Sequence, residues 1–139
     1  MKVNTQTITV CSKGNLDAHD ITNQAANLIQ ISSHTNGTIT LFTPSSTSGI
    51  TTIEFEDGCL KDIKRLFDEL ANSDRYYAHN ERWHDGNGHA HVCAALLGPS
   101  ITIPFLDKHM TLGIWQQIVF IDFDNKPRQR EIIAQIVGD

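Results

Sequence analysis

The residues most able to do chemistry gather in the stretch 76–98, YYAHNERWHDGNGHAHVCAALLG, which holds four of the seven histidines. They are His79, His84, His89 and His91, with Asp85 and Asn87 among them. Imidazole is the commonest metal ligand among side chains, and its unperturbed pKa lies near neutrality. A cluster of imidazoles beside a carboxylate and an amide therefore fits metal coordination or proton transfer. The alternative without chemistry is a solvated, histidine-rich loop.

The spacing of these residues favours a functional cluster. A helix that begins near Gly88 carries His91 in its first turn and directs His89 to a different face. His79 and His84 fall in a predicted loop that can fold back over the start of this helix. Aromatic residues flank the loop, and an apolar run follows His91. We therefore expect the loop to pack down and at least His91 to lie near the core.

Two further groups of residues are candidates for binding a phosphate. The loop 44–49, PSSTSG, offers the hydroxyls of Ser46, Thr47 and Ser48 as well as backbone N–H groups, which can hold an anion. Ser, Thr and Gly also form ordinary turns, and that is their commoner role. Arg128 and Arg130 lie on one side of an extended segment, either as a solvated edge or as a phosphate clamp.

Two further pairs of candidates lie in or next to predicted strands. Glu54 and Glu56 share one face if their segment is extended, and this pair either binds a ligand or faces solvent. Trp115 and Gln116 lie in a segment whose other residues suit a core. Packing and hydrogen bonding to buried backbone are their commoner roles.

The elements that must position these residues follow from the hydrophobic pattern. Period-two alternation or β-rich composition predicts strands at 3–10, 38–43, 50–55, 100–105, 110–112, 114–123 and 130–137. Helical spacing predicts a helix through Ile21 and Ile29, a second over 59–72 and a third from Gly88 to a stop at Gly98. This order is not a βαβ alternation. It predicts a single α+β domain over residues 1–139, with a largely antiparallel sheet and about three helices.

Composition narrows the class of protein. The chain has 139 residues, 40% hydrophobic and 19% charged, which is ordinary for one globular domain. Its formal net charge of -5 disfavours nucleic acid or an anionic membrane as the partner. The N-terminal stretch lacks the apolar run of a signal peptide, and no segment approaches the ~20 apolar residues of a membrane span. Three scattered cysteines fit buried thiols in a reducing cytosol, so we expect a cytoplasmic protein.

Three stretches together resemble the YjbQ family, often called the secondary thiamine-phosphate synthase family. They are STSGITTIEFEDG (46–58), YAHNERWHDGNGHAHVCAALLGPSITIPF (77–105) and LGIWQQIVFIDFDNKPRQREIIAQIVG (112–138). The segment LGIWQQI resembles the family's Gly-Thr-Trp-Gln signature, with Ile114 in the threonine position. His79 and His91 match family histidines, whereas many members have a histidine where this chain has Ser46. His84 and His89 belong to the segment WHDGNGHAH, which is particular to a subgroup of the family.

The resemblance implies a compact α+β subunit that assembles as a homotrimer, with a histidine-lined pocket close to a subunit boundary. It also implies a reaction that joins a hydroxymethylpyrimidine pyrophosphate to a thiazole phosphate and releases pyrophosphate. Such a step needs a stabilised leaving group, which a divalent metal with Arg, Ser and Thr donors would supply.

The sequence therefore predicts a metal-binding enzyme that acts on small phosphorylated molecules. We assign the metal, zinc or magnesium, to His79, His89 and His91, and acid–base roles to Glu54 and His84. The predicted substrate contacts are Ser46, Thr47, Ser48, Asn87, Trp115, Gln116 and Arg130. The alternatives are a zinc-assisted hydrolase with Glu54 as its base, a non-catalytic trimeric binding module, and histidines that satisfy one another at a trimer boundary.

Overall fold

The computed structural model describes all residues from 1 to 139 and contains eight strands and four helices. Their order is β1 (Lys2–Ser12), β2 (Asp17–Asp20), α1 (Thr22–Ile31), β3 (Gly37–Phe42), β4 (Ser48–Ile53), α2 (Asp57–Leu70), α3 (Ala78–Trp83), α4 (Gly88–Leu97), β5 (Ser100–Leu106), β6 (His109–Met110), β7 (Gln117–Asp122) and β8 (Arg128–Gly138). The predicted α+β class is confirmed, with four helices in place of about three.

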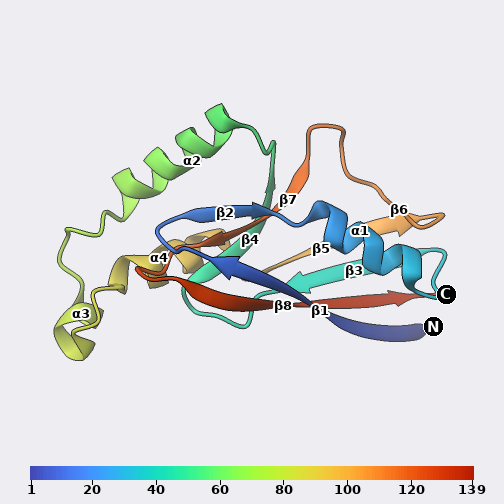
Figure 1. The fold of residues 1–139 in the computed structure, drawn as a ribbon, viewed down its shortest axis with the longest axis horizontal. Helices are drawn as coiled ribbons and strands as arrows, with labels where there is room; N and C mark the ends of the chain where they lie inside the picture. The colour runs from blue at the N-terminus through green and yellow to red at the C-terminus, as the bar shows by residue number, and fades with distance from the viewer.

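The strands form two sheets in which every pairing is antiparallel. The larger sheet has the order β1-β8-β3-β5-β6, and the smaller has the order β2-β7-β4. Figure 1 shows both chain termini at one end of the molecule, with α3 and the start of α4 near the opposite end. In the smaller sheet Ser48 pairs with Asp122 and Ile53 with Gln117, so the start of β4 lies beside the end of β7 and the end of β4 beside its start.

The two sheets enclose the larger core. Its fifteen buried apolar residues come from α1 and from strands of both sheets, among them Ile39, Phe105, Phe120 and Ile132. Strand β8 shows the alternation that this requires, since Ile132, Ala134 and Ile136 are buried while the residues between them are more exposed.

A smaller core lies on the other face of the smaller sheet. It joins Phe67 of α2 and residues of α4 to Val119, Ile121 and Phe123. Strand β7 is therefore covered on both faces, because its neighbours Ile118 and Phe120 belong to the larger core. This double burial explains why its sequence is almost continuously apolar rather than alternating.

Several boundaries differ from the sequence prediction. Strand β2 and helix α3 were not expected, because both are short and carry polar residues without a clear period. Strand β7 begins at Gln117 rather than at 114, and the two residues of β6 end before 112. Helix α2 begins at Asp57, because the Glu56 carboxylate accepts hydrogen bonds from the backbone N–H groups of Gly58 (2.8 Å) and Cys59.

None of the four helices is both long and apolar enough to cross a membrane.

Neighbouring isoleucines in β8 test the packing of the larger core. Ile132→Ala should lower the free energy of unfolding by about 2–5 kcal/mol, because the side chain is fully buried and its removal leaves a cavity. Ile133→Ala, on the opposite face and 37% exposed, should cost about 1 kcal/mol or less. Urea unfolding followed by circular dichroism measures both. Equal losses for the two variants would contradict this arrangement of the core.

Candidate functional site

The corner between α3 and α4 is fixed by a close backbone approach. A Cβ on Gly88 would lie 2.5 Å from Cβ of Tyr77, so only glycine fits at the first residue of α4. The Asn80 Oδ1 accepts a hydrogen bond from the Gly88 N–H (2.8 Å) and so satisfies one of the free donors at this helix start. The two helices therefore meet at a fixed position, which brings their histidines together.

His79 of α3 packs against His91 of α4, with ring centroids 4.3 Å apart. The Nε2 of His79 lies 3.2 Å from Oδ2 of Asp85, a residue of the connecting turn. A carboxylate in this position fixes the orientation of the imidazole ring. The segment that carries His79 therefore folds back over the start of the helix that carries His91.

The side-chain amide of Asn87 connects this histidine pair to a second group of polar residues. Placed toward the pair, its nitrogen donates to Asp85 Oδ1 (3.0 Å) and Oδ2 (3.2 Å), while His79 Nε2, 3.1 Å away, keeps its own hydrogen for Asp85. In the opposite amide orientation the nitrogen instead lies 3.4 Å from Asp124 Oδ1. We prefer the first orientation, because its contacts are shorter and because it places the amide nitrogen beside acceptors and the amide oxygen beside donors.

The second group is a buried network of two carboxylates and one guanidinium. Asp122 and Asp124 at the end of β7 are almost wholly buried. Arg130 of β8 donates to both oxygens of Asp122 through Nε (2.7 Å) and Nη2 (2.9 Å). The same Nη2 donates to Thr47 Oγ1 (2.8 Å), and that hydroxyl donates to Asp124 Oδ2 (2.9 Å). Arg128 Nε also donates to Asp124 Oδ2 (2.8 Å).

Burial and hydrogen bonding act in opposite directions on this network. Burial alone would raise the pKa of Asp124, but donors that include the Asn125 N–H, Thr47 and Arg128 outweigh it and lower the pKa. Hydrogen bonding to Asp122 raises the pKa of Arg130. At His91, burial lowers the pKa and the neighbouring His79 lowers it further, so the neutral imidazole is favoured.

A polar pocket of ≈ 290 Å³ lies where the histidine pair meets this network. Its wall includes Ser46, Thr47, Asn87, His91 and Arg128. A second pocket of ≈ 270 Å³ shares Ser45, Ser46 and His91 and extends toward Pro99. His91 thus borders both spaces, and it is the imidazole that a bound small molecule would meet.

The hydroxyls predicted to bind phosphate are unequally available. Ser46 is exposed at the pocket and forms no hydrogen bond within the chain. Thr47 is occupied by Arg130 and Asp124, and the Ser48 hydroxyl lies 2.8 Å from that of Thr43. Arg130 is likewise held by its carboxylate partners. Arg128, whose side chain is 36% exposed, uses only Nε in the network and so keeps its terminal nitrogens for an anion.

The structure does not bring His89 or His84 into this pocket. His89 is buried and lines a different cavity, beside Phe67 and Cys93. His84 ends α3 in a left-handed conformation and is exposed. Only His79 and His91 of the four clustered histidines are therefore paired.

Glu54, Trp115 and Gln116 lie at the other end of the smaller sheet. The five residue steps of β4 from Ser48 to Ile53 span about 17 Å at about 3.3 Å each, and Glu54 follows directly. Gln116 donates to Thr52 Oγ1 (3.0 Å) at that far end, and Trp115 is 69% exposed beside it. Within one chain, these residues do not reach the histidine pair.

The donor set of one chain does not fit a metal centre with three protein ligands. No group of three or more His, Cys, Asp or Glu side chains converges closely enough to hold an ion. His79 and His91 supply two nitrogens, while the carboxylate nearest to them, Asp85, is hydrogen-bonded to His79. Of the predicted trio, His89 lines one cavity and His91 another, and His79 packs against His91.

Sequence reasoning did not single out the two buried aspartates. Asp122 and Asp124 occur in the run IVFIDFD, at the end of a strand that is otherwise apolar. Carboxylates adjoining a doubly buried strand must be paired, so this position was a readable signal for a partner such as Arg130.

The fold and site define an α+β protein with a histidine-bearing polar pocket at one end of a three-stranded sheet. The chain belongs to the YjbQ family, because the family model described as "UPF0047 protein YjbQ-like" matches residues 6–139. A UPF0047 protein of Methanothermobacter thermautotrophicus is 34% identical over 138 residues, which cover 99% of this chain and 94% of that protein. The UPF0047 protein YugU of Bacillus subtilis is 32% identical over 120 residues, covering 86% of this chain and 88% of YugU.

Solved structures agree with this assignment. A YbjQ-like protein from Sulfolobus solfataricus has a TM-score of 0.94 at 30% identity, covering 99% of each chain. A YjbQ/UPF0047 family protein from Clostridium acetobutylicum has a TM-score of 0.86 at 30% identity, covering 95% of this chain and 99% of that one. The fold is therefore shared over nearly the whole chain.

The buried network makes stability depend on pH in a defined way. Arg130→Met leaves Asp122 buried without its guanidinium and leaves Asp124 with Arg128 alone, which should cost about 3–5 kcal/mol at pH 7.5. In the parent the lowered pKa of Asp124 contributes stability above its unfolded value near 3.8, and this is lost as pH falls through the folded pKa. In the variant that pKa rises, so the deficit should shrink between pH 7.5 and pH 5.

Urea unfolding at the two pH values measures this difference. Arg65→Met is the matched control, because Arg65 belongs to an exposed pair with Asp62 and its removal should cost about 1 kcal/mol or less. A deficit for Arg130→Met that does not change with pH would rule out an electrostatic origin.

Proposed function

We propose that this chain is an enzyme that acts on a small phosphorylated molecule, with His91 and His79 as its proton-transfer pair. The observation that carries the proposal is the packed imidazole pair, oriented by Asp85 and open to a polar pocket through His91. General acid–base catalysis needs a positioned group that can exchange a proton near neutral pH, and imidazole is the side chain best suited to it.

The opposite wall of the pocket supports a phosphate-bearing substrate. Ser46 offers a free hydroxyl and Arg128 offers its terminal guanidinium nitrogens. A guanidinium that is positioned by a carboxylate, as Arg128 is by Asp124, binds an anion without first having to be ordered. Thr47 and Arg130 act here as supports of the pocket wall.

The specific reaction that we propose is thiamine phosphate synthesis, as a weak or secondary activity. The bond between the pyrimidine methylene carbon and the pyrophosphate oxygen breaks, and the thiazole ring nitrogen supplies the electron pair of the new C–N bond. Pyrophosphate leaves with the electrons of the broken bond. Arg128 would stabilise the charge on the leaving group, and the His91 N–H would hydrogen-bond to it.

A divalent metal is the alternative to direct proton transfer. Zinc or magnesium on His79 and His91 would need its remaining ligands from substrate phosphate oxygens or from another subunit, because one chain offers no third donor. A zinc-assisted hydrolase with Glu54 as base would similarly need Glu54 from a neighbouring subunit.

We further propose that the protein assembles as a homotrimer. Ile114 and Trp115 are 82% and 69% exposed on the loop before β7. Phe55, which is 37% exposed, donates its N–H to Gln117 Oε1 (2.9 Å) at the end of the same loop. Large apolar side chains gathered on a surface favour a protein contact. Such a contact would give Trp115 and Gln116 a role at a subunit boundary, away from the pocket of their own chain.

The catalytic proposal is tested with the pyrimidine pyrophosphate and thiazole phosphate as substrates. His91→Ala should lower the rate of thiamine phosphate formation by about 100-fold or more, because it removes the N–H that hydrogen-bonds to the departing pyrophosphate. His84→Ala is the control and should change the rate little, since its ring lies outside the pocket. Equal rates in the parent and His91→Ala would contradict the assignment, and binding without turnover would favour a non-catalytic binding module.

The same assay on untagged protein distinguishes the metal-dependent mechanism from direct proton transfer. Activity that survives treatment with chelator, in protein without bound metal, would support direct proton transfer. The parent could instead contain stoichiometric zinc or magnesium that His91→Ala loses. If activity follows the metal content, the metal-dependent mechanism replaces direct proton transfer.

The trimer is tested by replacing its proposed contact. Ile114→Asp should convert the parent trimer to monomers in light scattering, because a carboxylate would be buried without a partner at the boundary. Val3→Asp, at a 62% exposed position on β1, is the matched control and should leave the trimer intact. A monomeric parent, or a trimer that tolerates Ile114→Asp, would rule out this contact.

A further inference from the structure

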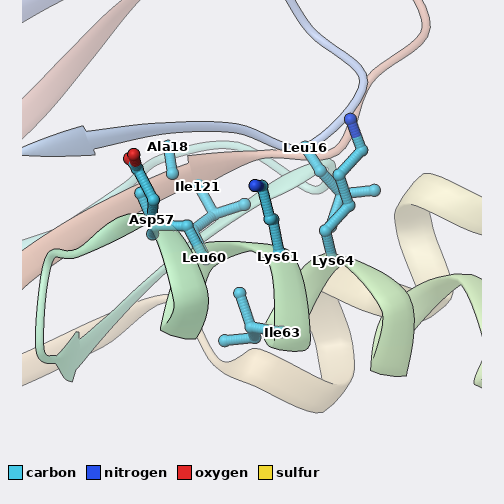
Figure 2. Close-up of a pocket in the computed structure, with 8 residues that line it drawn as sticks. All are labelled: Leu16, Ala18, Asp57, Leu60, Lys61, Ile63, Lys64 and Ile121. Carbon is cyan, nitrogen blue, oxygen red and sulfur yellow. The ribbon is translucent and has the colours of Figure 1, made fainter.

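A groove separate from the histidine site lies between α2 and the smaller sheet. One part of the groove is a cavity of ≈ 240 Å³. Figure 2 shows residues that border it, which include Leu60 and Ile63 of α2 and Leu16, Ala18 and Ile121 on the other side. A second cavity of ≈ 190 Å³ shares Leu16 and Lys64 with the first, so the two adjoin. The groove therefore has an apolar part and a more polar extension.

Two lysines stand at the border of the apolar part. Figure 2 shows Lys61 and Lys64 extending from α2 toward the side that carries Leu16. Neither ammonium group has an ion-pair or hydrogen-bond partner, although α2 carries several acidic residues. Arg65, the next residue along, does pair with Asp62 and Glu69. Asp57 and Asp68 of α2 also line the two cavities, so the lining carries both signs of charge, and the two ammonium groups are its unpaired cations.

The polar extension holds a buried imidazole without a partner. His89 is 8% exposed and lines the cavity together with Lys64, Ser73 and Cys93. Its Nδ1 is fully buried and has no hydrogen bond. Because Nδ1 is shielded, a ligand in the cavity meets the accessible edge of the ring, whose Nε2 has no hydrogen-bond partner within the chain.

We propose that this groove binds a small anionic molecule with an apolar body, of the alkyl or aryl carboxylate class. The apolar body lies between α2 and the smaller sheet, against Ile63 and Ile121. The carboxylate lies at the junction of the two cavities, where Lys64 provides an ion pair and His89 a hydrogen bond. Lys61 adds a second positive charge along the groove.

The chemistry of the lining decides between ligand classes. An apolar floor disfavours a compact, highly charged ligand such as inorganic phosphate, because most of the groove would offer it no polar contact. A purely apolar ligand would leave Lys64 and His89 without partners. An amphipathic anion satisfies both parts, and this proposal holds whether or not the histidine pair is catalytic.

Octanoate is the probe, because it combines an eight-carbon body with one carboxylate, and 1-octanol of equal length is its uncharged counterpart. Calorimetry on the full chain should show saturable octanoate binding. Lys64→Gln should weaken binding about tenfold, the size expected for one charge-assisted hydrogen bond. Arg65→Gln makes the same charge change on α2 away from the groove and should leave the affinity unchanged. Ala18→Met, which fills the groove, should abolish binding.

His89 is tested by a pair of substitutions. His89→Leu should weaken octanoate binding, and His89→Gln should restore part of it, because the amide can donate a hydrogen bond where leucine cannot. The proposal is overturned by an absence of saturable binding, by equal effects of Lys64→Gln and Arg65→Gln, or by 1-octanol binding as tightly as octanoate. Catalytic rates play no part in these outcomes, so failure of the proposed reaction would leave them unaffected.

Discussion

The pairing of two buried aspartates with Arg130 is the constraint on which the rest of the site depends. Ionised carboxylates cannot be buried without partners, and here the partners come from β8 and from Thr47 in the loop before β4. One set of hydrogen bonds therefore joins the end of β7, the start of β8 and the 43–48 segment. The same set orients Arg128, whose terminal nitrogens remain available at the pocket. Positions that sequence patterns assign to substrate, such as Thr47 and Arg130, turn out to hold this framework together.

The doubly buried strand β7 explains why the candidate residues divide into two groups. Its ends lie at opposite sides of the smaller sheet, with the paired aspartates at one end and Gln117 at the other. Ser46, Asn87 and His91 gather at the aspartate end, whereas Glu54 and Trp115 lie about 17 Å away at the other. A chain of this size can bring both groups to one place only by assembling with further copies of itself.

Much of the fold could be predicted from the sequence, because period and composition report burial directly. The helix from Gly88 to Gly98 follows from such a pattern, as does the preceding segment that folds back over its start. Strand β2 and helix α3 could not be predicted, because each is too short to show a period. The separation of Glu54 from the histidines also could not, since it depends on the register of β4 against β7. Local patterns say which face a side chain occupies, but not what stands opposite that face.

In the first turn of α4, the helix face that a histidine occupies decides which cavity it borders. Two residues at about 100° each place His89 and His91 about 200° apart around the helix, so their side chains leave in nearly opposite directions. His91 borders the polar pocket with the paired aspartates behind it, and His89 borders the groove beneath α2. This turn is anchored by Asn80 and by the contact of Gly88 with Tyr77. Because His89 and His91 belong to the same anchored turn, the polar pocket and the groove lie on opposite faces of α4, less than one turn of helix apart.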